Sequence, residues 1–216
     1  MRGFFITFEG TDGCGKSTQL KLAAKRLKSL GYSVLVTKDP GGTRAGEEIR
    51  KILLFRKKGA DSIDAVAEIF LYCASRRVLV TRVIEPALKK GKVVLCDRFT
   101  DSTLAYQGFG RGLPMADLRK VCAITCQGIT PDLTIFLDME LEEALGRIGK
   151  ADRMETAGLD FQRRVRQGFK TLARRESARI KVISGAGPQA QVFSRIRPYL
   201  VASLPPRLRK KERRSG

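Results

Sequence analysis

Residues 4–18 read FFITFEGTDGCGKST, and the rest of the chain can be read outward from this stretch. The apolar run 4–8 predicts a buried strand, and Gly10, Gly15, Lys16 and Ser17 follow it with the G-x-x-x-x-G-K-[ST] spacing of a phosphate-binding loop. Glycines there let backbone N–H groups turn toward phosphate oxygens. Leucines and alanines then recur at helical spacing from 20 to 30, so a helix N-terminus directs its partial positive charge at the same phosphates.

The loop residues are expected to act through both side chains and backbone. Lys16 would reach the outer phosphates of ATP, and the Ser17 hydroxyl would contact Mg²⁺. The alternative is a glycine-rich turn with a chance lysine, but the strand and helix on either side are the context that the motif requires. The predicted ATP-binding residues are Gly10, Thr11, Asp12, Gly13, Cys14, Gly15, Lys16, Ser17 and Thr18.

Length and composition favour one compact α/β domain. The chain has 216 residues, of which 43% are hydrophobic, enough to bury a sizeable core. We expect this domain to span 1–204 and to be followed by a disordered basic tail at 205–216, because Pro205 and Pro206 mark a boundary. No apolar run approaches the roughly 20 residues of a membrane-spanning helix, and the chain enters its first strand without the layout of a signal peptide. A cytoplasmic protein is predicted.

Cysteine and histidine usage restricts the chemistry. The five cysteines are scattered and odd in number, which argues against a disulfide framework. Cys122 and Cys126 are one helical turn apart, but the chain has no histidine and no second cysteine pair to complete a zinc site. We therefore interpret the cysteines as small core residues. Without histidine, acid–base chemistry would need other groups, whereas phosphoryl transfer works mainly by positioning and charge neutralisation.

The net charge of +20, from 42 basic and 22 acidic residues, favours anionic partners. The tail at 205–216 carries six basic residues and one acidic residue, so it accounts for +5 of the total. Nucleotides and nucleic acid are both anionic, and the charge does not choose between them.

Alternating strand and helix patterns predict a doubly wound, five-stranded parallel sheet with helices on both faces. After the first strand, short β-branched runs predict the others. Their ranges are 33–37, 93–97, 132–138 and 180–184. Helices are expected after Thr43, which is a candidate N-cap, and over 61–85, 114–127, 140–147, 159–178 and 189–204.

Asp97 ends the predicted strand 93–97, and Arg98 follows it directly. Ligands of open parallel sheets lie beyond the carboxyl ends of the strands, so both side chains should meet the phosphates of the loop. Asp97 would hold Mg²⁺ directly or through water, and Arg98 would bridge the donor and acceptor phosphates. The alternative is a surface salt bridge at the end of a strand.

Motifs that follow one another in the expected order give a family resemblance. D-R-F at 97–99, Ser102, A-Y-Q-G at 105–108 and G-R-G-L at 110–113 closely resemble the thymidylate kinase family, which phosphorylates dTMP. The loop at 8–18, the D-P-G-G-T turn at 39–43 and Y-x-A-x-R at 72–76 are also similar to elements of that family, the last two to its E-P-G-G-T turn and its F-x-A-x-R thymine-binding element. The similarity runs from about Phe4 to the last helix. On spacing alone, Tyr72 and Arg76 would more often be a core edge and a solvated helix face.

The resemblance implies transfer of the ATP γ-phosphoryl group to dTMP, giving dTDP and ADP with Mg²⁺, by a homodimer. It further implies that Tyr72 stacks on thymine, Arg76 hydrogen-bonds the exocyclic oxygen of the base, and Arg50 binds the 5′-phosphate. Asp12 would accept the sugar 3′-hydroxyl, and Tyr106 would crowd the 2′ position. The implied acceptor-side residues are Asp12, Arg50, Tyr72, Arg76, Arg98, Ser102, Tyr106 and Gln107.

A short lid is expected at about 146–157. Its cations Arg147, Lys150 and Arg153 would close over ATP and join Lys16, Arg98 and Asp12 as catalytic residues. Some members of the family carry an arginine in the phosphate-binding loop, while others have glycine there and an arginine in the lid. Gly13 implies the second arrangement here. On sequence alone a solvated basic turn is an equal alternative, and the cation that reaches the phosphates stays open.

Three residues depart from the pattern of the family: Asp39 replaces glutamate, Tyr72 phenylalanine, and Phe99 tyrosine. Asp39 shortens a carboxylate by one methylene, which could weaken its contact. Two other functions stay open from sequence. One is a related kinase acting on another nucleotide or a deoxynucleoside, and the other is a nucleic-acid-binding protein that uses ATP as a switch.

Overall fold

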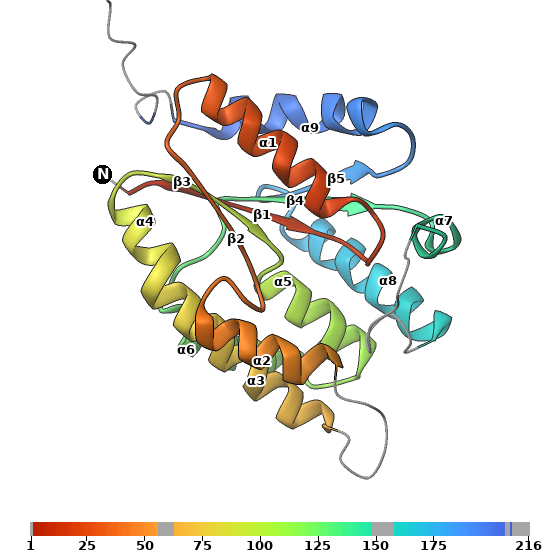
Figure 1. Ribbon diagram of the computed structural model, residues 1–216. Helices are drawn as coiled ribbons and strands as arrows, with labels where there is room; N and C mark the ends of the chain where they lie inside the picture. The colour runs from red at the N-terminus through yellow and green to blue at the C-terminus, as the bar shows by residue number, and fades with distance from the viewer. Residues whose placement is uncertain (1, 56–62, 148–157, 206–207, 209–216) are drawn as a thin grey trace, which may run out of the picture.

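The computed structural model describes residues 2–55, 63–147, 158–205 and 208. In this part of the chain five parallel strands form one sheet in the order β2-β3-β1-β4-β5 (Figure 1). The first strand of the sequence therefore lies at the centre of the sheet, and the predicted doubly wound fold is confirmed. The strands are β1 (Phe4–Glu9), β2 (Val34–Lys38), β3 (Val93–Asp97), β4 (Leu133–Asp138) and β5 (Ile180–Ser184).

The helices follow the predicted pattern with shifted ends. They are α1 (Lys16–Ser29), α2 (Arg44–Phe55), α3 (Ala65–Leu79), α4 (Glu85–Lys89), α5 (Thr100–Thr103), α6 (Met115–Cys126), α7 (Leu141–Leu145), α8 (Leu159–Arg175) and α9 (Gln189–Ser203). Two π-helical turns, Val80–Ile84 and Leu104–Gly110, connect α3 to α4 and follow α5.

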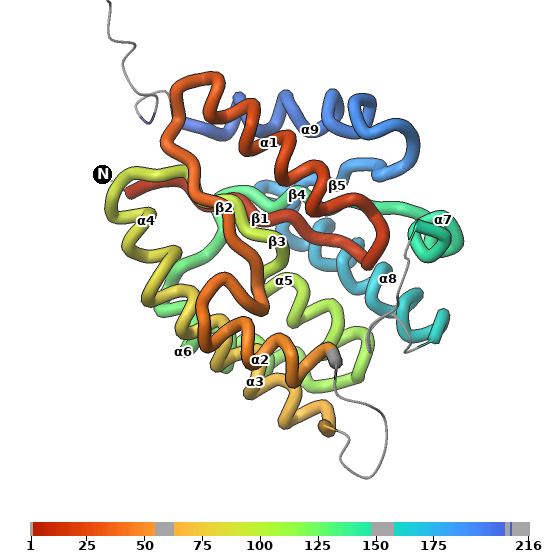
Figure 2. Tube along the Cα trace, in the orientation of Figure 1, coloured from red at the N-terminus to blue at the C-terminus, as the bar shows by residue number. Residues whose placement is uncertain are grey.

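Helices cover both faces of the sheet. Helices α1 and α9 lie together on one face, whereas α3, α6 and α8 lie on the other (Figures 1 and 2). Leu20 and Leu27 of α1, with Ile196 of α9, pack on Ile6 and Leu95 of the sheet. Burial of these two opposite faces fixes the sheet as the middle layer of the fold.

The strand register brings the loops after β1, β2 and β3 to one edge of the sheet. Phe8 of β1 and Lys38 of β2 both pair with Asp97 of β3. Beyond the strands, the Arg98 N–H donates to the carbonyl of Phe8 at 3.0 Å, and the Asp39 N–H donates to the carbonyl of Asp97 at 2.9 Å. The sheet itself therefore positions the residues that follow these three strands.

The helix expected over 61–85 begins later and continues further. It starts at Ala65 because the Asp64 carboxylate accepts hydrogen bonds from the N–H groups of Val66 and Ala67, while 61–62 lie outside the described residues. Helical backbone then continues to Lys89. Pro86 does not end it, since this proline lies in the first turn of α4, where a missing N–H is tolerated.

The remaining sequence expectations have mixed outcomes. All five cysteines are buried and free, which agrees with their interpretation as core residues. Thr43 does cap α2, because its hydroxyl oxygen accepts the N–H of Gly46 at 3.0 Å. Most of the predicted tail, 206–207 and 209–216, lies outside the described residues. Among the helices described, none has the length and apolar character needed to span a membrane.

Candidate active site

Two glycines shape the phosphate-binding loop between β1 and α1. Gly10 has φ 141°, and a Cβ there would lie 2.6 Å from the carbonyl oxygen of Leu137 and 2.8 Å from the Cys14 sulfur. Gly15 has φ 93° directly before α1, so an L side chain would be strained although space is open around it. The loop can close tightly against β4 and still leave backbone N–H groups at the helix N-terminus for an anion.

Lys16 is held at the base of this loop. Its side chain is 7% exposed, and its ammonium donates to the Thr11 carbonyl at 2.8 Å and lies 3.8 Å from the Asp12 carboxylate. A lysine fixed in this way directs its charge into the loop without the entropy cost of ordering a free side chain.

Ser17 and Asp97 offer oxygen ligands next to the loop. The Ser17 hydroxyl donates to the Asp97 carboxylate at 2.7 Å, and both side chains line the same pocket as Lys16. Hydroxyl and carboxylate oxygens are hard donors that suit Mg²⁺, which is commonly bound by one or two protein groups with the other ligands from phosphate and water. The described residues contain no group of three or more metal-binding side chains, and a site of this kind does not need one.

Arg98 turns the chain beside this pair. Its φ of 69° is unusual for a residue other than glycine, and it sends the guanidinium back over the loop. There the guanidinium donates to the Gly10 carbonyl at 2.9 Å, to Ser102 at 3.0 Å, and to the carboxylate of Asp12. Burial alone would raise the pKa of Asp12, but Arg98 and Lys16 outweigh it and lower this pKa to about 2.

A second pocket adjoins the first, and Arg98 lines both. It contains every acceptor-side residue expected from the sequence and also Asp39, Pro40, Leu54, Phe99 and Thr103. Tyr106 donates its hydroxyl to Asp12 at 3.0 Å, and burial raises its pKa, so the phenol keeps the proton that it donates. Gln107 donates to Glu68 at 2.7 Å.

The two pockets share four residues. Asp12, Asp39, Arg50 and Arg98 line both the phosphate-binding pocket and the second pocket. The structure therefore brings the two sets of predicted residues to adjoining spaces. The segments that follow three neighbouring strands supply charged side chains to this shared wall. Asp12 follows β1, Arg50 lies in the helix after β2, and Arg98 follows β3.

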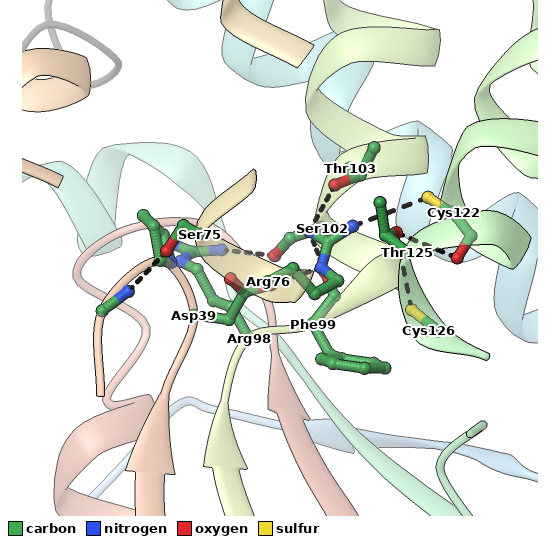
Figure 3. Close-up of polar contacts among 12 residues, drawn as sticks. Asp39, Ser75, Arg76, Arg98, Phe99, Ser102, Thr103, Cys122, Thr125 and Cys126 are labelled. Atoms are coloured by element: carbon green, nitrogen blue, oxygen red, sulfur yellow. Dashed lines mark hydrogen bonds and ion pairs between the residues drawn. The ribbon is translucent and has the colours of Figure 1, made fainter. Parts of the chain in front are cut away.

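Arg76 is buried more deeply than a solvated helix face would allow. It is 1% exposed, and its Nε–H donates to the Asp39 carboxylate at 2.6 Å (Figure 3). One terminal nitrogen donates to Thr103 at 2.7 Å and to the Phe99 carbonyl at 3.5 Å, and the other to the Cys122 sulfur at 3.5 Å. Among the described residues these contacts use four of the five guanidinium N–H groups, and one N–H has no acceptor there.

Comparison with known proteins identifies this arrangement. A sequence model described as thymidylate kinase matches residues 8–196.

The chain belongs to the thymidylate kinase family.

Similar proteins from several bacteria carry the same name. A thymidylate kinase of Dehalococcoides mccartyi (strain CBDB1) is 45% identical over 202 residues, covering 93% of this chain and 96% of that protein. One of Synechococcus sp. (strain JA-2-3B'a(2-13)) is 46% identical over 201 residues, with the same coverage. The crystal structure of the thymidylate kinase from Ehrlichia chaffeensis superposes with a TM-score of 0.78 at 32% identity, covering 93% of this chain and 100% of that one.

Membership of the thymidylate kinase family makes this chain an ATP-dependent nucleoside monophosphate kinase, which is a phosphotransferase. The resemblance inferred from the sequence motifs is thereby confirmed. A nucleic-acid-binding protein that merely uses ATP as a switch is not what the relatives are named for.

The lid expected at about 146–157 is only partly described. Arg147 lies just after α7, where its guanidinium donates to the Glu143 carboxylate at 2.6 Å. Lys150 and Arg153 lie outside the described residues. Arg166 and Lys170 of α8 bind the carboxylate of Asp138, so the end of β4 is tied to α8.

Glu9 is the residue of the site that sequence reasoning missed. It ends β1 and is fully buried, and its carboxyl group accepts the Phe99 N–H at 2.7 Å and the Ser102 hydroxyl. Glu9 thus holds in place the segment that follows Arg98. The signal in the sequence was a glutamate at the end of an apolar strand. A carboxylate buried there must find hydrogen-bond or charge partners or lose its charge.

We expect Glu9 to make the stability of the enzyme depend on pH. Burial, reinforced by the charge of Asp101, raises the pKa of Glu9 to about 8 from 4.5. A carboxyl whose pKa is higher in the folded state stabilises the fold while it is protonated, and this contribution is lost as pH rises through 8. The melting temperature should therefore fall between about pH 5 and pH 8, where the unfolded chain ionises Glu9 and the folded chain does not, and it should fall more steeply than in Glu9→Gln, which cannot ionise. Equal slopes in the two proteins would contradict the assignment.

Proposed function

We propose that this enzyme transfers the γ-phosphoryl group of ATP to dTMP, giving dTDP and ADP. The observation that carries the proposal is the wall shared by two pockets, one built on the phosphate-binding loop and one containing Tyr72 and Arg76. Phosphoryl transfer needs a donor and an acceptor that meet in line, and cations between them that neutralise the developing charge.

On the donor side, the loop from Gly10 to Thr18 would bind the phosphates of ATP through its backbone N–H groups and Lys16. Ser17 and Asp97 would hold Mg²⁺, which when bound neutralises phosphate charge and orients the outer phosphates. The contacts described above hold Lys16 in place, so the protein spends little of its binding energy on ordering that side chain.

On the acceptor side, Tyr72 would stack on thymine and Arg76 would donate its remaining N–H to the exocyclic oxygen. Arg50, whose guanidinium already donates to the Pro40 carbonyl at 3.0 Å, would bind the 5′-phosphate. Asp12 would accept the 3′-hydroxyl, and Tyr106 would leave no room for a 2′-hydroxyl. Ser102 and Gln107 would complete this wall.

Arg98 would act at the boundary between donor and acceptor. Its planar guanidinium can contact two phosphates at once, which the point charge of a lysine does less well. The low pKa of Asp12 keeps its carboxylate ionised across neutral pH, so it anchors Arg98 rather than exchanging protons with it. The lid would add one cation from Arg147, Lys150 or Arg153 and exclude water.

A panel of acceptors tests the proposal. ADP release should be measured with ATP and Mg²⁺ and with dTMP, dUMP, dCMP, dGMP or dAMP supplied separately, and a reaction without acceptor sets the baseline. We expect the highest kcat/KM with dTMP. Preference for another nucleotide would overturn the choice of substrate in favour of the related-kinase alternative and leave the assignment to the family intact.

Changing Arg76 should separate the two substrates. Arg76→Lys keeps a cation near Asp39 but loses the planar fork, so we expect the KM for dTMP to rise at least about tenfold while the KM for ATP stays within about twofold. Initial-rate kinetics with either substrate varied provide the measurement. Tyr72→Phe is the matched control in the same pocket, since it preserves the aromatic surface and should change both constants little. Equal increases in both KM values would argue against a thymine contact.

A homodimer is also part of the proposal. Apolar side chains are exposed on neighbouring helices of one side: Ile52 on α2, Val66 and Phe70 on α3, and Ile124 on α6, the last two at 61% and 75% exposure. Exposed apolar patches of this kind commonly mark protein interfaces. Analytical ultracentrifugation should give twice the mass of the chain, and Phe70→Glu should give the mass of one.

We further propose that the enzyme works in the cytoplasm, where ATP is supplied.

A further inference from the structure

The layer formed by α1 and α9 carries positive charge without acidic residues. The sequence has no aspartate or glutamate from 13 to 38 or from 177 to 211. These two stretches contain α1 and α9, which lie side by side on one face of the sheet (Figures 1 and 2). Neither helix can therefore neutralise its own cations or those of its neighbour.

The lysines of α1 form a stripe on its outer surface. Lys21, Lys25 and Lys28 recur at the i, i+4, i+7 spacing of one helix face, and all three are exposed. The opposite face of α1 carries Leu20 and Leu27, which are buried in the core. At a rise of about 1.5 Å per residue, the stripe covers roughly 10 Å of the helix. Arg26 of α1 and Arg197 of α9 are also exposed on this layer.

The cations of this layer differ from other surface lysines in their surroundings. Lys51, Lys89 and Lys120 each lie within 4 Å of a carboxylate three or four residues away, at 2.8, 2.7 and 3.7 Å. Within the described residues, no such ion pair involves Lys21, Lys25, Lys28 or Arg197. Uncompensated charges of one sign create a surface potential that attracts polyanions.

The chemistry of the surface favours nucleic acid over a lipid membrane. Binding in a membrane interface requires an apolar helix face that can insert, but the apolar face of α1 is already buried against the sheet. Helix α1 also has no aromatic residue on which unpaired bases could stack. What remains is a row of cations, which suits the phosphates of a duplex.

We propose that the outer face of α1, together with Arg197 of α9, binds the phosphate backbone of double-stranded nucleic acid without sequence preference. This property goes beyond the kinase activity and does not depend on it. The lysine stripe begins five residues after Lys16, on an exposed helix face rather than in the pocket that contains Lys16. The enzyme should therefore hold a duplex and turn over nucleotides at the same time.

The test compares the full chain with two variants of equal charge. One is Lys21→Gln/Lys25→Gln/Lys28→Gln, and the matched control is Lys51→Gln/Lys89→Gln/Lys120→Gln. Fluorescence anisotropy with a labelled mixed-sequence DNA duplex of about 24 base pairs measures affinity between roughly 50 and 200 mM salt. Loss of three phosphate contacts should lower the slope of log affinity against log salt by about 2.7 and the affinity at the lower salt at least tenfold. The control should change both much less.

Other outcomes would overturn the proposal. Unchanged binding by the α1 variant would assign any affinity to the basic tail, and equal losses in both variants would mean that only net charge matters. Sedimentation with phosphatidylserine vesicles tests the membrane alternative, which would be favoured if the α1 substitutions abolished vesicle binding and spared the duplex. The ADP-release rate with ATP and dTMP should stay within about twofold in both variants, which verifies folding and separates this result from the proposed function.

Discussion

Replacing Lys16 by alanine is expected to lower kcat with ATP and dTMP by about a thousandfold, the largest effect of any single lysine. The ammonium is buried at the base of the loop and fixed by the Thr11 carbonyl, so its charge is available to the phosphates without rearrangement. Water entering the space left by alanine would supply dipoles but no fixed cation. Steady-state ADP release, with calorimetric titration of ATP, would divide the loss between catalysis and binding.

Lys21→Ala is the matched control for Lys16→Ala. It removes the same group from the same helix, five residues further on, at an exposed position outside both pockets. We expect its kinase activity to stay within about twofold of the wild type. A similar loss of activity in both variants would show that the long-range charge of α1, rather than contact with phosphate, is what Lys16 supplies.

Arg98→Ala should have an effect of similar size, a loss of about a thousandfold in kcat/KM for dTMP. This guanidinium lines both pockets and contacts the Gly10 carbonyl, Ser102 and Asp12. Its removal takes away a cation between the substrates and also the partner of the Asp12 carboxylate. The pKa of Asp12 should then rise from about 2, because the cation that lowers it most is gone. Rates measured with dTMP and with ATP varied separately provide the test.

Arg98→Lys separates charge from shape. It keeps a positive charge but cannot form the planar, two-pronged contact, so we expect activity between that of Arg98→Ala and the wild type. Arg119→Ala is a control that removes a guanidinium from α6, away from both pockets. If Arg98→Lys were as active as the wild type, a bridging role would be excluded and only a local positive charge would be required.

Much of the fold could be predicted from local signals. The motif at 10–17 predicted a strand, a loop and a helix together. The apolar runs located the other strands within one or two residues, because parallel strands buried on both faces are nearly continuous runs of apolar residues. Ends of helices were less certain. The helix expected over 61–85 continues as helical backbone to Lys89, because Pro86 lies in the first turn of α4, where a proline is tolerated.

Residues of the candidate site could be predicted where they belong to a sequence motif. The surroundings of a residue were harder to predict where they depend on burial in the folded chain. On spacing alone Arg76 would lie on a solvated helix face, yet it is enclosed by Asp39, Thr103 and Phe99, residues 23 to 37 positions away in sequence. Arg76→Ala would thus strand the Asp39 carboxylate and destabilise the fold by about 3–5 kcal/mol, which is why a lysine is the better probe. Glu9 was not predicted for the same reason, because the groups that surround its carboxyl come together only when the chain folds.

The wall common to the two pockets has a thermodynamic consequence. Four residues line both pockets: Asp12, Asp39, Arg50 and Arg98. A ligand in either pocket therefore changes the electrostatic field and the hydrogen-bonding partners that the other pocket offers. Such heterotropic coupling is reciprocal. If bound dTMP changes the dissociation constant of ATP by some factor, bound ATP must change the dissociation constant of dTMP by the same factor. The two substrates of this enzyme are therefore also effectors of one another.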